Sequence, residues 1–105
     1  MAVELIVCLE ADVNYVWLHY RQHNHNQKHL AAKTLKWVEA QLPGFIRIHQ
    51  SIIINPTHID QTTSRNAQPM VIQMTNGMTL PVSRRRVERV RQLIMNFVPV
   101  LTPTS

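Results

Sequence analysis

The sequence of 105 residues predicts a mostly β fold with one or two helices, built as a single domain. Short runs rich in β-branched and aliphatic residues, clearest over 3–9 and 45–55, are typical of strands. Asn76 and Gly77 between alternating apolar residues favour a β-hairpin, because both tolerate positive φ. We expect the domain to span residues 1–98 and the tail over 99–105 to be frayed.

The first third of the chain predicts strands. Residues 3–9 are almost continuously apolar, which suits a strand buried on both faces, and the run breaks at 10–14. Residues 15–20 are aromatic and β-branched, and the polar stretch 22–27 has the composition of a hairpin loop. We therefore expect a short returning strand near 29–31.

One helix is predicted between residues 33 and 42. Leu35, Val38 and Leu42 follow helical spacing, Thr34 is suited to the N-cap, and Pro43 stops the helix. Strands are expected again over 45–55, 70–74 and 78–82, the last two flanking Asn76 and Gly77, with a turn where Asn55 precedes Pro56.

A second helix is predicted near the C-terminus. Val87, Val90, Ile94 and Phe97 lie on one helical stripe, and Ser83 stands where an N-cap is expected. On this prediction Arg84, Arg85 and Arg86 occupy the first turn, where the helix dipole already has its positive end. An external anion, such as a DNA phosphate or a guanine edge, is the simplest compensation. Arg89 and Arg91 extend the basic character.

Charge and composition favour a polyanionic partner over catalysis. The chain has eleven Lys and Arg residues and six Asp and Glu residues, which gives a formal charge of +5. The chain lacks a glycine-rich phosphate loop, a plausible carboxylate pair and a nucleophile with an identifiable base, so we expect neither an enzyme nor a cofactor. A lone cysteine, Cys8, excludes an intrachain disulfide and is expected to be buried and inert. With no targeting segment evident, we expect a cytoplasmic protein.

A polar insert interrupts the apolar run 45–55. Gln50 can pair with an adenine edge in the major groove, and the Ser51 hydroxyl suits a phosphate oxygen. The alternative is an ordinary loop in which His49 forms a hydrogen bond to the backbone.

Taken together, these segments resemble a LytTR DNA-binding domain. The Phe-x-Arg-Ile-His-x-Ser-x-Ile-x-Asn pattern over 45–55 is followed by Pro-Val-Ser-Arg over 81–84, and the resemblance covers residues 3–97. It implies about ten short strands in stacked antiparallel sheets that contact double-stranded DNA through three loops, two of them entering successive major grooves. By position, Asn14 and Tyr15 correspond to the first loop, Gln50 to the second and Arg84 to the third.

The resemblance further implies a bacterial transcription regulator. Arg85 and Arg86 are expected on phosphate or base, and the expected DNA-binding residues also include His49, Ser51, Ser83 and Arg89. Two copies are expected on paired sites. Such domains usually follow a receiver domain, for which this chain has no room. We therefore expect the signal to enter through a partner such as an inhibitory membrane protein, through protein abundance or through the domain itself, and we expect no small-molecule substrate. Many relatives have a cation or Asn at the position of Gln50, so the preferred DNA sequence cannot be transferred from them.

Two alternatives stay open at this point. His19, His23, His25 and His29 invite a zinc hypothesis, although a strand, loop and strand do not bring them to one face. Without metal, their protonation would add positive charge and tighten anion binding. The second alternative is a protein-interaction module that uses the same basic face to bind an acidic partner.

Overall fold

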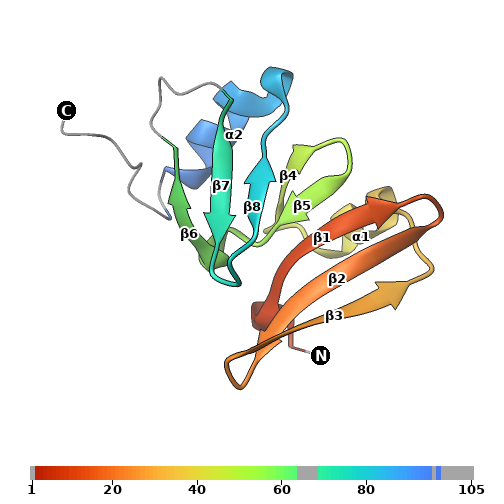
Figure 1. The fold of residues 1–105 in the computed structure, drawn as a ribbon. Coiled ribbons are helices and arrows are strands. Elements are labelled where there is room, and N and C mark those ends of the chain that lie inside the picture. The colour runs from red at the N-terminus through yellow and green to blue at the C-terminus, as the bar shows by residue number, and fades with distance from the viewer. Residues whose placement is uncertain (1, 64–68, 96, 98–105) are drawn as a thin grey trace.

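Eight strands form two antiparallel β-sheets in the part of the chain that the structure describes (Figure 1). The computed structural model describes residues 2–63, 69–95 and 97. Five strands make the larger sheet, in the order β3-β2-β1-β5-β4, and three make the smaller one, in the order β6-β7-β8. The predicted mostly β class with two helices is therefore confirmed, with eight described strands instead of about ten.

The larger sheet contains both hairpins of the first third of the chain. Its strands are β1 (Ile6–Asp12), β2 (Tyr15–Gln22), β3 (His25–Ala31), β4 (Ile46–His49) and β5 (Ile52–Ile54). The 3-10 turn η1 (Val3–Leu5) precedes β1, so the strand predicted over 3–9 begins later. Strand β1 also continues into the break predicted at 10–14, because Glu10 pairs with Trp17 and Asp12 with Tyr15.

The prediction of a loop over 22–27 is wrong, because most of that polar stretch belongs to strands β2 and β3. Only His23 and Asn24 form the turn, with φ of 53° and 63°, and Gln22 already pairs with His25. Asn and His tolerate this left-handed conformation better than most residues. The tight turn therefore lets both strands extend fully.

The smaller sheet consists of β6 (Ile59–Thr62), β7 (Val71–Met74) and β8 (Thr79–Pro81). Its β7–β8 hairpin confirms the prediction from Asn76 and Gly77. Gly77 has φ of 90°, and the Asn76 Oδ1 accepts a hydrogen bond from the Met78 amide over 3.1 Å. Upstream, Asn55 caps the 3-10 turn η2 (Pro56–His58) that leads from β5 into β6.

Helix α1 (Leu35–Gln41) forms as predicted. The Thr34 hydroxyl accepts the Trp37 amide over 3.1 Å, which satisfies one of the free N–H groups of the first turn. Leu35 and Val38 are buried against Leu9 and Ile53 of the larger sheet. The helix therefore covers one face of that sheet.

Helix α2 (Val87–Ile94) begins later than predicted. Arg84–Arg86 form the 3-10 turn η3, and Ser83 makes no capping hydrogen bond to the backbone. Val90 and Ile94 are buried as predicted, whereas Phe97 lies beyond the helix and is half exposed. The three arginines thus stand before α2 and not in its first turn.

The core lies on both faces of the larger sheet. Val7, Ile54, Met74 and Ile94 belong to the cluster that joins this sheet to the smaller sheet and α2. Cys8 is fully buried in the same cluster, with its thiol 3.7 Å from the Met78 sulfur. The second cluster, against α1, lies on the opposite face. Strands β1 and β5 therefore contribute side chains to both clusters, and along β5 the residues alternate between them.

The predicted C-terminal tail over 99–105 lies outside the described residues. Neither α1, of seven residues, nor α2, of eight, has the length and apolar character that a membrane crossing needs, and the described chain has no other α-helix.

Candidate nucleic-acid interface

Three segments far apart in the sequence meet along one side of the molecule (Figure 1). The Ala11 amide donates to the Ser51 carbonyl over 2.8 Å, which joins the β1–β2 hairpin to the β4–β5 turn. The Ser83 amide donates to the Ile48 carbonyl over 2.9 Å, which joins the segment after β8 to β4. We call the surface formed by residues 13–15, 50–51 and 83–86 the three-loop face.

The middle loop is held by a side chain of β4. Arg47 donates from Nε to the His49 carbonyl over 3.2 Å and from Nη2 to the Gln50 carbonyl. Its Nη1 lies 3.1 Å from Glu39 Oε1, which ties the loop to α1. The Gln50 side chain itself is exposed. A planar guanidinium thus fixes the backbone while leaving the amide side chain available.

His49 takes part in the same turn. Its Nδ1 accepts the Ser51 amide over 3.2 Å and lies 3.1 Å from the Ser51 hydroxyl. Because Nδ1 is an acceptor here, Nε2 is the ring nitrogen available to donate outward. Both side chains are half buried, so the backbone role anticipated for His49 is present in the structure.

The third loop presents cations without partners. Arg84 and Arg85 are exposed, and the described residues offer neither of them an ion pair. Arg86 is half buried and donates to the Ser83 hydroxyl over 3.2 Å. Charges that no neighbouring carboxylate neutralises are available to an external anion.

A hollow of about 440 Å³ lies beside this loop. Arg86, Arg89 and Arg47 line it together with Glu39, and Phe45 and Leu93 contribute apolar surface. Arg89 is exposed on α2, and no ion pair to it is seen among the described residues. The basic surface therefore extends from η3 along α2.

The first loop is a two-residue turn between β1 and β2. Asp12 pairs with Tyr15, and the Asp12 Oδ2 accepts the Trp17 indole N–H over 3.3 Å. Asn14 and Tyr15 are exposed, and Val13 is 93% exposed with φ of 52°. A β-branched residue in that region costs on the order of 1–3 kcal/mol of backbone strain.

All ten residues that the sequence singled out thus lie on the three-loop face or beside it, and they come from three segments. The exposed ones are Asn14, Tyr15, Gln50, Arg84, Arg85 and Arg89. The half-buried ones are His49, Ser51, Ser83 and Arg86.

Two residues of this surface were not predicted. Arg47 alternates with the buried Ile46 and Ile48, so its outward direction could have been inferred from the strand pattern, but its bonds to the turn could not. The positive φ of Val13 has no sequence signal, because valine is not expected there.

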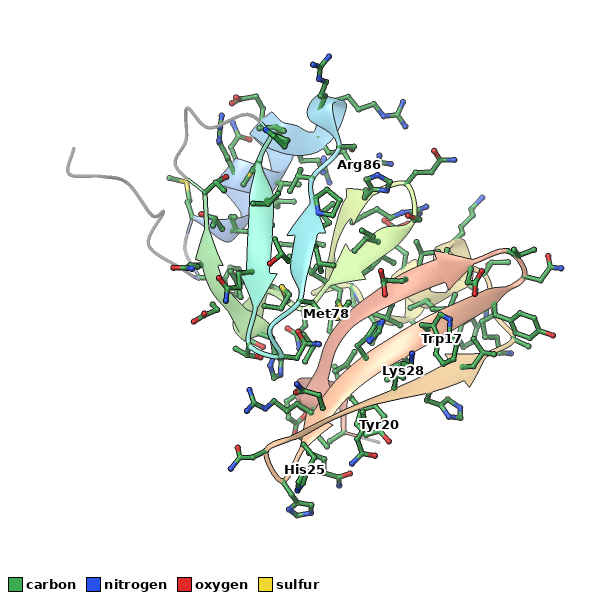
Figure 2. All side chains as sticks on the ribbon, in the orientation of Figure 1. Trp17, Tyr20, His25, Lys28, Met78 and Arg86 are labelled. Atoms are coloured by element: carbon green, nitrogen blue, oxygen red, sulfur yellow. The ribbon has the colours of Figure 1, made fainter. Side chains whose placement is uncertain are left out.

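The four clustered histidines do not converge. His19 lies on one face of β2, 2.6 Å from Glu10, whereas His25 and His29 project from the other face of the sheet. No group of three or more metal-binding side chains occurs within the described residues. Figure 2 shows His25 near the β2–β3 turn.

Lys28 and Trp17 form a cation–π contact on the same sheet (Figure 2). The Lys28 Nζ lies over the Trp17 ring, 4.7 Å from the ring centroid.

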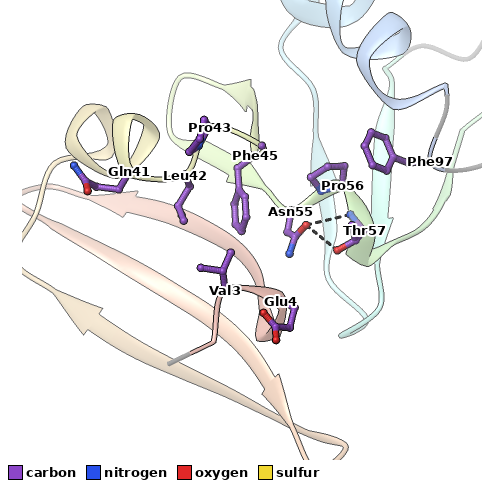
Figure 3. A pocket seen from close by; sticks show the side chains of 11 residues that line it. Val3, Glu4, Gln41, Leu42, Pro43, Phe45, Asn55, Pro56, Thr57 and Phe97 are labelled. Atoms are coloured by element: carbon purple, nitrogen blue, oxygen red, sulfur yellow. Dashed lines mark hydrogen bonds between the residues drawn. The ribbon is translucent and has the colours of Figure 1, made fainter.

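A second hollow, of about 510 Å³, shares Pro43 and Phe45 with the first (Figure 3). Its lining is mostly apolar and includes Val3, Pro56 and Phe97. The Asn55 Oδ1 at its edge accepts hydrogen bonds from the amide and the hydroxyl of Thr57. The Asn55 amide therefore stabilises the turn, as its position before Pro56 predicted.

Comparisons with known proteins identify the family. The family model described as the LytTr DNA-binding domain matches residues 1–95. Among solved structures, the LytTr DNA-binding domain of a methyl-accepting/DNA response regulator from Bacillus cereus is similar, with a TM-score of 0.68 and 23% identity over 90% of this chain and 84% of that one. No curated protein matches. Because the family match spans both sheets and nearly all of the described chain, the protein belongs to the LytTR family of DNA-binding domains.

Proposed function

We propose that this protein is a transcription regulator that binds double-stranded promoter DNA in a sequence-specific way through the three-loop face. The observation that supports this most is the pair of main-chain hydrogen bonds, Ala11 to Ser51 and Ser83 to Ile48, that align three exposed polar loops. Loops fixed in this way enter successive major grooves without a recognition helix.

In this proposal, base contacts and phosphate contacts come from different residues. Gln50 pairs with an adenine edge, Arg84 with a guanine edge, and the loop of Asn14 and Tyr15 contacts a further base pair. The remaining polar groups bind the DNA backbone, where they fix the position of the protein on the duplex without reading the base sequence. These are His49 through Nε2, Ser51, Ser83, Arg85, Arg86 and Arg89.

The proposal includes partners besides DNA. Two copies of this cytoplasmic protein bind paired sites, and a membrane-protein inhibitor or another regulatory partner supplies the signal. An acidic protein is the alternative ligand, because Arg84, Arg85 and Arg89 would pair with carboxylates as readily as with phosphates.

The test is selection of bound duplexes from a random pool, followed by affinity measurements on the selected duplex, a scrambled duplex and a polyglutamate chain. We expect the selected duplex to bind at least about a thousandfold more tightly than the scrambled one. With three arginines on phosphates, log K should fall against log salt with a slope of about −3. Equal affinity for both duplexes would contradict sequence-specific binding, and tighter binding to polyglutamate would favour the alternative.

A further inference from the structure

Val13 is an anomaly at the tip of the first loop. Its side chain is 93% exposed, and its φ of 52° belongs to the left-handed region that β-branched residues avoid. The protein therefore accepts both the exposure of an isopropyl group and the strain of its backbone at one position. Neither contributes to the stability of the free domain.

The β2–β3 hairpin, which also has a two-residue turn in the same sheet, shows no such conflict. Its turn residues, His23 and Asn24, also have positive φ, of 53° and 63°, but both types are enriched in that conformation. This turn lies at the opposite end of β2, away from the three-loop face (Figure 1). Among the described residues, Val13 is thus the only β-branched residue with positive φ, and it lies on the three-loop face.

The position of Val13 is fixed from two sides. The main-chain bond from Ala11 to Ser51 holds the hairpin against the β4–β5 turn, and the Asp12 carboxylate accepts the Trp17 indole N–H. Pairing of Asp12 with Tyr15 closes the turn. The isopropyl group is therefore presented in one place, which lowers the ordering cost of a contact made there.

Apart from Tyr15, the exposed side chains of the three-loop face besides Val13 are polar or charged, so the Val13 isopropyl group suits an apolar feature of the ligand. In the major groove that feature is the C5-methyl group of thymine, which apolar groups such as alanine, phenylalanine and the threonine methyl contact. We propose that Val13 is a specificity-determining residue that contacts the C5-methyl of one thymine in the site. This inference rests on the proposed function and adds one base-specific contact to it.

The experiment removes the thymine C5-methyl group and the Val13 isopropyl group separately. In the duplex selected by the wild-type protein, each thymine is replaced in turn by uracil, which lacks only the C5-methyl. We expect one replacement to weaken wild-type binding about fourfold, the equivalent of one buried methyl group. The same replacement should have no effect on Val13→Gly or Val13→Asn, both of which accept positive φ and should raise the Tm.

Asn24→Gly in the distant turn is the matched control, and it should keep the wild-type response to uracil. If every uracil duplex binds the wild-type protein as well as the thymine duplex does, the inference is overturned while the proposed function stands. Equal losses in wild type and Val13→Gly also overturn it, because a group other than Val13 would then contact the thymine methyl. Absence of wild-type binding to any selected duplex would remove the proposed function as well.

Discussion

The amide of Ser83 and the carbonyl oxygen of Ile48 lie 2.9 Å apart and form a hydrogen bond between segments 35 positions apart in the chain. Gln50 lies two residues beyond Ile48, and Arg84 lies next to Ser83. The spacing of these two exposed side chains is therefore set by the backbone. Substituting either side chain should leave the other in place, so their contributions to DNA binding can be measured separately.

Arg84→Ala and Arg89→Ala should weaken DNA binding in different ways. Arg84 is assigned to a base edge, so its loss should cost about 1–3 kcal/mol and relax the preference at one base pair. Arg89 is assigned to phosphate, so its loss should weaken all sequences alike and reduce the salt slope by about 0.9. Binding to a set of single-base variants of the selected duplex checks both. Sequence-blind losses from both variants would contradict this assignment.

Arg47→Lys should weaken DNA binding although it keeps the charge. Lysine lacks the planar fork that bonds the His49 and Gln50 carbonyls, so the middle loop loses its fixed geometry. We expect about a tenfold loss of affinity with a loss of about 1 kcal/mol in unfolding free energy. Arg21→Lys is the matched control, because Arg21 donates to the Thr75 carbonyl at the distant end of β2. Equal effects of the two variants on affinity would mean that Arg47 acts only through stability.

Asn55→Ala should destabilise the fold without touching the three-loop face. The Asn55 side chain, 5% exposed, donates to the Ile6 carbonyl over 2.8 Å and accepts two bonds from Thr57. Removing it leaves a buried carbonyl without its donor, which costs about 1–3 kcal/mol. Urea unfolding measures this loss, and DNA affinity of the folded protein should not change. A variant as stable as wild type would show that water replaces the amide.

The Cys8 thiol should make stability fall at alkaline pH. Burial, and to a smaller extent the Glu10 carboxylate, raise the pKa of Cys8 from 9.0 to about 12. The unfolded chain therefore loses this proton first, so the contribution is complete below pH 9 and is lost as pH rises from 9 toward 12. Within that window unfolding free energy should fall by about 1.4 kcal/mol per pH unit more than in Cys8→Ala. Parallel curves for the two proteins would contradict a buried neutral thiol.

Elements with local determinants could be predicted from the sequence. Helix α1 depends on its own spacing and on Thr34, and the β7–β8 turn depends on Gly77. The β2–β3 hairpin was predicted, but its loop was drawn too long because the polar residues 22–27 resemble a loop, while the pairing of Gln22 with His25 is a sheet interaction. The late start of α2 also escaped prediction, since Ser83 donates its amide to Ile48 instead of capping the helix with its hydroxyl.

The candidate site was predictable only in part. Residue types and the family resemblance pointed to Gln50 and Arg84, yet no periodicity relates two positions 34 residues apart. Their proximity follows from the sheet order and from one main-chain bond. The bracing role of Arg47 depends on carbonyl directions in the turn, which no residue pattern encodes.

The two hydrogen bonds that align the loops, Ala11 to Ser51 and Ser83 to Ile48, join main-chain atoms. They therefore do not depend on which side chains stand at positions 14, 50 and 84. We therefore expect a substitution at one of these positions to alter the preferred DNA sequence without weakening the scaffold. Duplicated copies of such a domain can diverge toward separate promoters through one or two changes, and a library randomised at those three positions should retain mostly folded members.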